Sequence, residues 1–196
     1  MAPKYKTHIP EPRKVRNHQP LDMNTTVLRL GHRPLRDKRL STHLILCARA
    51  LGAQKVIYSG EEDLRLEEGI RDIVERWGGD FQIQYELNWR GVVKQWKGNI
   101  VHLTMYGIPV EEAIQEIRAH DEPLLVVVGG PKVPRDMYEN STWNVSVTTQ
   151  PHSEVSALAL FMYLLRGESA LKHEFPGGSI KITPSERGKE VEVSKD

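Results

Sequence analysis

The stretch from Leu124 to Leu165 constrains the fold of this 196-residue chain more than any other. A short, β-branched apolar run, 124–128, stops at the pair Gly129-Gly130, which predicts a strand buried on both faces. A loop leads to a second short run, 143–147, and a long apolar-periodic segment begins at His152. Two strand ends and a helix N-terminus are therefore expected to border one crevice, which is where open α/β sheets bind ligands.

Strand and helix patterns alternate along the rest of the chain. Further strands are predicted at 27–30, 55–58, 81–85 and 100–105, with a small edge strand around Ile180 and Ile182. Helices are predicted from Asp37 or Ser41 to the C-terminal Gly52, at 59–77, 88–97 and 109–120, and from His152 to about Arg166. Residues 32–39 are expected to form a basic loop, Ser59 to Glu62 a capping box, and Pro151 the first turn of the last helix. The pattern predicts an α/β fold, with a mostly parallel sheet covered by helices on both faces.

The chain divides into three expected parts. Residues 1–21 form an irregular basic arm, residues 22–183 a single domain, and residues 184–196 a charged tail. Basic residues outnumber acidic ones from Lys4 to Arg39, which indicates a local patch for an anionic partner. For the residues before 20, a solvated basic tail is an equally open interpretation.

Composition excludes several classes of protein. Charged residues make up 27% of the chain but the formal net charge is only +1, so the whole molecule has no global attraction to nucleic acid. The single cysteine, Cys47, excludes an internal disulfide, and the scattered histidines lack the spacing of metal ligands, so no metal is expected. No membrane span or apolar signal core is present, which predicts a cytoplasmic protein.

The familiar nucleotide and hydrolase motifs are absent. Neither G-x-G-x-x-G, G-x-x-x-x-G-K-[ST] nor G-x-S-x-G occurs, which argues against a dinucleotide-binding oxidoreductase, a P-loop and a nucleophile elbow. The glycine pair 129–130 alone could be a simple turn. Because three neighbouring strand ends (103–107, 128–133 and 145–154) finish in small or polar residues, a cleft for a small molecule is favoured.

Several blocks resemble a known family. The stretch WNVSVTTQPHSEVSALALFMYLL, 143–165, resembles the closing motif of the SPOUT methyltransferase superfamily. The blocks RLGHRPLRDKRLSTH, ARALGA, LTMYG and VVGGPKVP are similar to one branch, the archaeal tRNA (cytidine-56)-2′-O-methyltransferases. The resemblance covers roughly 27–165, with the blocks in the same order, and leaves out the arm and the tail.

The resemblance implies a deep C-terminal trefoil knot, a homodimer whose active site draws on both subunits, and S-adenosyl-L-methionine as cofactor. It implies 2′-O-methylation of cytidine 56 in the tRNA T-loop, with tRNA as the partner and neither a membrane nor a metal. Carried over by motif, the cofactor contacts would be Leu103, Gly107, Gly129, Gly130, Pro131, Lys132, Val133, Val147, Thr148, Thr149, Gln150, Pro151, His152, Ser153 and Glu154.

At the catalytic position this chain departs from the broader family pattern. Related 2′-O-methyltransferases use an arginine of the first motif, but alignment on Gly52 places Leu46 at that position. The expected catalytic residues are therefore Arg36 and, second, Arg39, although both could instead only hold tRNA phosphates. The expected phosphate contacts are Arg29, Arg33, Lys38 and Arg90. A catalytically silent RNA-binding module of the same fold is the alternative function.

Overall fold

The computed structural model describes residues 23–130 and 132–194, and the predicted basic arm, 1–21, lies outside these ranges. The strands are β1 Thr25–His32, β2 Lys55–Gly60, β3 Gln82–Tyr85, β4 Asn99–Pro109, β5 Leu124–Gly129, β6 Trp143–Ser146, β7 Ile180–Thr183 and β8 Glu190–Val193. The helices are α1 Pro34–Ala50, α2 Leu64–Trp77, α3 Trp89–Gln95, α4 Val110–Ile117, α5 Arg135–Glu139 and α6 Glu154–Arg166, followed by the 3₁₀ helix η1 Gly167–Leu171.

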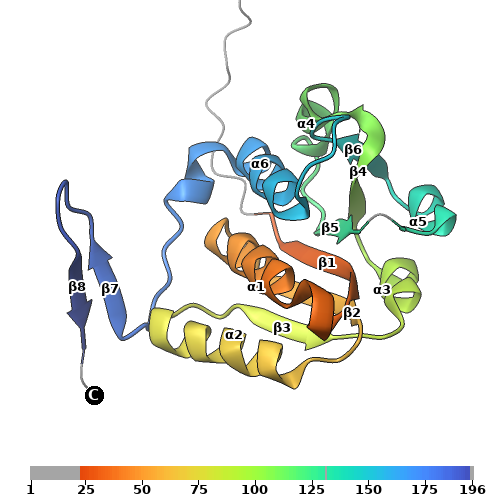
Figure 1. Cartoon of the computed structure of the whole chain (residues 1–196). Helices are drawn as coiled ribbons and strands as arrows, with labels where there is room; N and C mark the ends of the chain where they lie inside the picture. Colours follow the sequence, from red (N-terminus) through yellow and green to blue (C-terminus); the bar gives the residue numbers. More distant parts are fainter. Residues whose placement is uncertain (1–22, 131, 195–196) are drawn as a thin grey trace, which may run out of the picture.

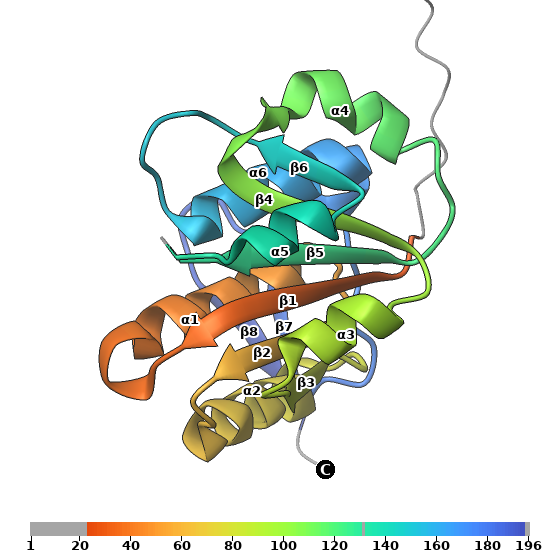
Figure 2. The same ribbon diagram turned by 90° about the vertical axis from the view of Figure 1, so that its right-hand side faces the viewer.

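Six strands form one sheet in the order β3-β2-β1-β5-β4-β6, and every neighbouring pair is parallel. The predicted α/β fold with a mostly parallel sheet is confirmed. Because the strands all run the same way, their carboxyl ends meet at one edge, where the loops leading into α1, α5 and α6 gather (Figure 2). This edge carries the candidate site.

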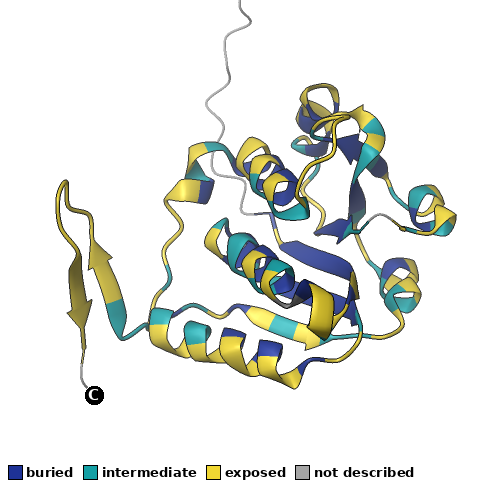
Figure 3. Ribbon diagram, viewed as in Figure 1, coloured by how far each residue is buried: buried dark blue, intermediate teal, exposed yellow. Residues whose placement is uncertain are grey.

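The alternation of side chains along each strand divides the core into two layers. Val27 of β1 and Val126 of β5 belong to the larger cluster, which is completed by buried residues of α1, α2, α4 and α6. Their chain neighbours Leu28 and Val127 point to the other face, where α3 and α5 cover a smaller cluster that includes Met137. The helices therefore lie on both faces, as Figure 1 shows, and the central strands are buried (Figure 3).

The helix starts differ from the sequence-based expectation at three places. Residues 34–39, expected in a loop, form the first turns of α1, because Pro34 occupies a first-turn position where its missing N–H costs nothing. α2 is capped by Asp63, whose Oδ1 accepts from Leu66 N at 3.0 Å, and not by Ser59. α6 is capped by Ser153, so Pro151 precedes the helix.

The C-terminal part forms a separate two-stranded element. β7 pairs antiparallel with β8, and the two strands stand away from the six-stranded sheet (Figure 1). A small strand does form at Ile180–Thr183, but the expectation that it joins the edge of the main sheet is wrong, because it pairs with β8. The expected boundary at residue 183 falls between the two strands, so the predicted charged tail contributes a paired strand.

β4 contacts β6 in two separate places. Residues 101–103 pair with 143–145, and then, after an irregular segment, Ile108 and Pro109 pair with Val145 and Ser146. At the irregular segment Gly107 lies directly on the backbone of β6, since a Cβ built there would come within 2.5 Å of the carbonyl of Asn144. The end of β4 therefore bends closely around β6.

Candidate functional site

A cavity of about 440 Å³ lies at the carboxyl ends of β4 and β5, and the loop between β6 and α6 forms part of its lining. Nine of the residues predicted to contact a cofactor line it: Leu103, Gly129, Gly130, Val133, Val147, Pro151, His152, Ser153 and Glu154. The structure thus brings together three segments that lie far apart in the sequence, as the strand order requires. The volume of the cavity is in the range of small-molecule binding sites.

The remaining predicted cofactor residues lie elsewhere. Thr148, Thr149 and Gln150 belong to the loop before α6 but do not line the cavity, and Gly107 packs on the backbone of β6. Lys132 borders a neighbouring hollow, described below, and Pro131 lies outside the described residues. For these residues a contact with a ligand stays a prediction.

The glycine pair at the end of β5, Gly129 and Gly130, leaves backbone groups accessible. A Cβ at Gly129 would come within 2.7 Å of Val133 Cγ2, so the loop packs closely over this glycine and a side chain here would force a shift. A Cβ at Gly130 would meet only Glu154 Oε1, at 3.5 Å. A flat ligand could therefore approach the N–H and C=O groups of this loop.

The structure shows a cluster of polar side chains at the cavity that the sequence analysis does not predict. The hydroxyls of Thr104 and Tyr138 are hydrogen-bonded at 3.0 Å, and Tyr138 packs edge-on against His102 with ring centroids 4.6 Å apart. Nδ1 of His102 is hydrogen-bonded to Oδ1 of Asn144 at 2.9 Å. All but Asn144 line the cavity. Tyr138 belongs to α5, a stretch expected to be loop, and the only available signal was its place between two motif blocks.

The expectation that Arg29 contacts RNA phosphates is wrong. Its side chain is only 2% exposed, and it is buried between β1, α1 and α6. The guanidinium lies 3.1 Å from Glu154 Oε2, donates to Ser41 Oγ at 3.0 Å and to the Leu30 carbonyl at 2.9 Å, and lies 3.9 Å from Asp37. Sequence alone cannot separate this buried arginine from its exposed neighbours, because all belong to one basic block.

Glu154 brings this ion pair to the wall of the cavity. Burial raises the pKa of Glu154, and the positive charge of Arg29 opposes that rise. A buried carboxylate that loses its partner is strongly destabilising. Arg29 is therefore a structural residue that holds Glu154, and with it the start of α6, against β1.

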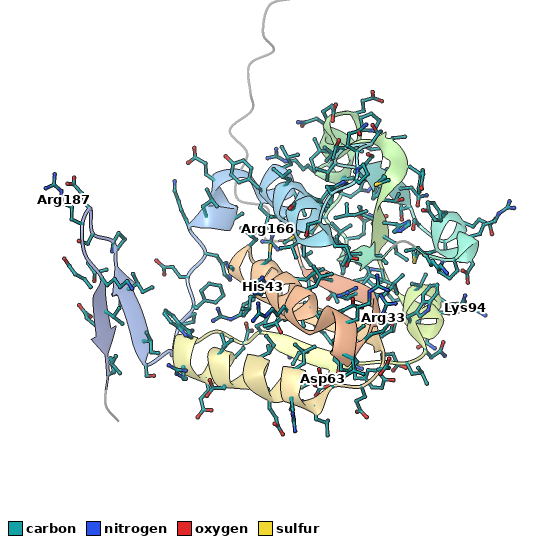
Figure 4. All side chains as sticks on the ribbon, viewed as in Figure 1. Arg33, His43, Asp63, Lys94, Arg166 and Arg187 are labelled. Carbon is teal, nitrogen blue, oxygen red and sulfur yellow. The ribbon has the colours of Figure 1, made fainter. Side chains whose placement is uncertain are left out.

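A second hollow, of about 550 Å³, adjoins the cavity at Gly130 and Val133. Arg33 and Arg36, from the start of α1, border it (Figure 4 labels Arg33), whereas Arg39 borders neither space. The guanidinium of Arg33 donates to Asp37 at 3.0 Å, and that interaction holds the pKa of the Asp37 carboxyl below its usual value although burial opposes the shift. Arg36 is mostly solvent-exposed, with its Nε 4.0 Å from Asp37.

The two other predicted phosphate contacts are Lys38 and Arg90, and Arg90 lines neither space. The side chain of Lys38 is not among those that the structure describes. Arg90 is exposed on α3, where it pairs with Asp136 at 2.5 Å and lies over the ring of Trp89 at 4.4 Å from its centroid. RNA contacts of Arg33, Lys38 and Arg90 stay predictions.

Two buried histidines at this edge predict a pH-dependent stability. Burial lowers the pKa of His32 and of His102 from 6.5, although a hydrogen bond to Asp63 or Asn144 opposes the shift. Below pH 6.5 these histidines bind protons in the unfolded chain but remain neutral in the folded chain. The free energy of unfolding therefore falls as the pH falls.

The expected loss is at most about 1.4 kcal/mol per pH unit for each histidine. Urea unfolding at about pH 7 and about pH 5.5 measures this loss. His102→Gln should make the dependence less steep, with His43→Gln, at an exposed position of α1, as the control for replacing a histidine. A variant as steep as the wild type would contradict the assignment.

Two features are absent from the described residues. Among residues 23–130 and 132–194, no helix has the length and apolar character needed to cross a membrane. Within the same ranges, no three His, Cys, Asp or Glu side chains are grouped so that they could hold a metal ion.

Solved structures share this fold. A crystal structure titled RNA 2′-O ribose methyltransferase superposes with a TM-score of 0.56 at 18% sequence identity, covering 80% of this chain and 60% of that longer one. The crystal structure of the A. aeolicus TrmH/SpoU tRNA modifying enzyme gives a TM-score of 0.55 at 15% identity, and the match covers 78% of this chain and 80% of that one. At such identities the likeness establishes the fold, which is that of the SpoU/TrmH proteins.

Sequence relatives are much closer. The tRNA (cytidine(56)-2′-O)-methyltransferase of Thermococcus kodakarensis is 51% identical over 170 residues, which are 84% of this chain and 94% of the relative. The protein of the same name from Archaeoglobus fulgidus is 52% identical over 169 residues, 86% and 98% of the two chains. The family model described as tRNA ribose 2′-O-methyltransferase, aTrm56, matches residues 77–192. With its fold, its cavity and these relatives, the chain belongs to the aTrm56 family of tRNA ribose 2′-O-methyltransferases.

Proposed function

We propose that this chain transfers a methyl group from S-adenosylmethionine to the ribose 2′-oxygen of cytidine 56 in tRNA. The observation that carries the proposal is the pairing of two adjoining spaces at one sheet edge. One is a cavity with glycine backbone in its wall, and the other is bordered by two arginines. The names of the close relatives support the same reaction.

The lining of the cavity suits the proposed cofactor. Adenine is flat and largely apolar, with an edge that pairs with backbone groups, and Leu103 and Val133 offer apolar surface beside the accessible backbone at Gly130. Oε2 of Glu154 pairs with Arg29, whereas Oε1 lies beside Gly130 and offers a hydrogen-bond acceptor in the cavity wall. When bound, S-adenosylmethionine supplies an activated methyl group, so the protein needs chiefly to position the acceptor.

The ribose hydroxyl is a poor nucleophile at neutral pH, so a cation near its oxygen lowers the barrier as negative charge develops. Arg36 is the proposed cation, since it borders the hollow beside Gly130 and its ion pair with the buried Asp37 is long, at 4.0 Å. Arg33, fixed by Asp37, is proposed to hold an RNA phosphate. The exposed Arg39 keeps only the second place among the proposed catalytic residues.

We further propose that the chain is knotted and dimeric, and that it works in the cytoplasm. The two contacts of β4 with β6, and the close approach of Gly107 between them, support a knot at this point. Leu160, Tyr163 and Leu164 of α6 are partly exposed, which supports packing against a second subunit. Contributions of that subunit to the site are part of the same proposal.

Nucleoside mass spectrometry tests the proposed reaction. Unmodified tRNA transcript is incubated with the protein and isotope-labelled S-adenosylmethionine, and the label is expected in 2′-O-methylcytidine from position 56. A transcript with a 2′-deoxyribose at that position is the control, and it should take up no label. Label on a base, or at another ribose, would refute the proposal. Folded protein that binds RNA without transferring any methyl group would favour the silent RNA-binding module.

A further inference from the structure

The hollow beside the cofactor cavity has a definite place in the fold. It lies at the carboxyl ends of β1 and β2, between the start of α1 and the start of α3, with Gly130 in the wall shared with the cavity. Its volume of about 550 Å³ is enough for one nucleotide-sized ligand. A group bound in it would lie next to whatever occupies the cavity.

The hollow is bordered by both positively and negatively charged side chains. Arg33, Arg36 and Lys132 bring three positive charges, and Glu61 brings one negative charge. Within the described residues, no hydrogen bond or ion pair is found for the side chain of Lys132 or of Glu61. The position of Glu61 is nevertheless fixed, because its backbone N–H donates to the His32 carbonyl at 2.9 Å. A ligand here should be anionic and should also carry a hydrogen-bond donor.

One aromatic side chain completes the wall. Trp89 is half-buried against the smaller core cluster and borders the hollow. Arg90 lies over its ring and is itself held by Asp136, which limits the ring's freedom to move. Aromatic surfaces of this kind bind nucleobases, since every base has an apolar face.

We propose that this hollow is the pocket for the target nucleoside, and that Glu61 selects cytidine over uridine. The inference rests on the proposed function and adds the origin of its base specificity. The base lies against Trp89, its phosphates face Arg33 and Lys132, and its ribose faces the shared wall at Gly130. To enter, the nucleotide leaves its stack and turns into the protein.

The choice between the two pyrimidines follows from one functional group. Cytosine carries an amino group at its fourth position, which can donate to a carboxylate, whereas uracil carries a carbonyl oxygen there, which a carboxylate repels. Because Glu61 has no competing partner among the described residues, its carboxylate is available for that donor. A glutamine at this position is a weaker acceptor for the cytosine amino group and can donate to the uracil carbonyl. The preference for cytidine should therefore weaken for both reasons.

The test compares two tRNA transcripts, with C56 or U56, in methyl transfer by the intact chain. For Glu61→Gln we expect the ratio of kcat/KM for C56 over U56 to fall at least about tenfold. The Kd for S-adenosylmethionine and the Tm should stay at the wild-type values. Glu62→Gln, which changes the exposed neighbour that does not border the hollow, is the matched control and should keep the wild-type ratio.

Two results would overturn the inference alone. One is a wild-type C56 preference in Glu61→Gln, and the other is an equal loss on both transcripts, which would make Glu61 a structural residue. A wild-type protein that leaves C56 unmethylated would instead overturn the proposed function together with the inference. As a second readout, Trp89→Leu should raise KM for the C56 transcript about tenfold with an unchanged Kd for the cofactor. An unchanged KM would show that the target base does not contact Trp89.

Discussion

Arg36→Ala should slow methyl transfer by ~10²-fold or more while leaving the affinity for S-adenosylmethionine nearly unchanged, the scale of losing one electrostatic stabiliser. The reason lies in the position of the side chain. Arg36 borders the hollow that adjoins the cavity, and its only ionic neighbour among the described residues is Asp37, at 4.0 Å. It is therefore free to move to a developing negative charge. Single-turnover methyl transfer and calorimetry with the cofactor separate the two effects.

The control is Arg65→Ala, which removes an exposed arginine from α2, away from both spaces, and should retain wild-type turnover. Arg39→Ala discriminates between the two proposed arginines. A large loss there, with Arg36→Ala unaffected, would move the role to Arg39. A loss in Arg36→Ala that appears only as weaker tRNA binding would reduce Arg36 to a phosphate contact.

Gly107→Ala should destabilise the folded chain by about 3 kcal/mol or more. The added methyl group would come within 2.5 Å of backbone atoms of Asn144 and Val145, and a backbone cannot yield as a flexible side chain does. The bend of β4 around β6 would have to open, and the cavity wall at Leu103 would move with it. Urea unfolding, followed by far-UV circular dichroism, measures the loss.

Gly130→Ala is the matched control for that variant. Its added methyl group meets only Glu154 Oε1, at 3.5 Å, so it should fold with nearly wild-type stability. If Gly107→Ala proved as stable as Gly130→Ala, the close packing of β4 on β6 would be wrong. The contrast also isolates backbone crowding from the general cost of replacing a glycine.

Much of the sheet could be predicted from sequence because its signals are local. The β-branched run of β5, bounded by a glycine pair, predicts a buried strand, and the observed strand spans Leu124–Gly129. The three strand ends predicted to meet do border one cavity. Local patterns are sufficient here because parallel strands place their carboxyl ends together whatever the detailed contacts.

Other features depend on contacts between distant residues, which no local pattern records. Arg29 and Arg33 belong to one basic block, yet Arg29 is buried because Glu154, far along the chain, supplies its counter-charge. The bend of β4 requires β6 beside it. α5 is too short to show helical periodicity, so the contribution of Tyr138 to the cavity was missed.

A crystal structure of the chain with S-adenosylhomocysteine tests the central claim most directly. The predicted result is adenosine density in the cavity between Leu103, Gly130 and Glu154, with the sulfur turned towards the hollow that Arg36 borders. Density for the ligand elsewhere on the protein, with this cavity closed by side chains, would contradict the account.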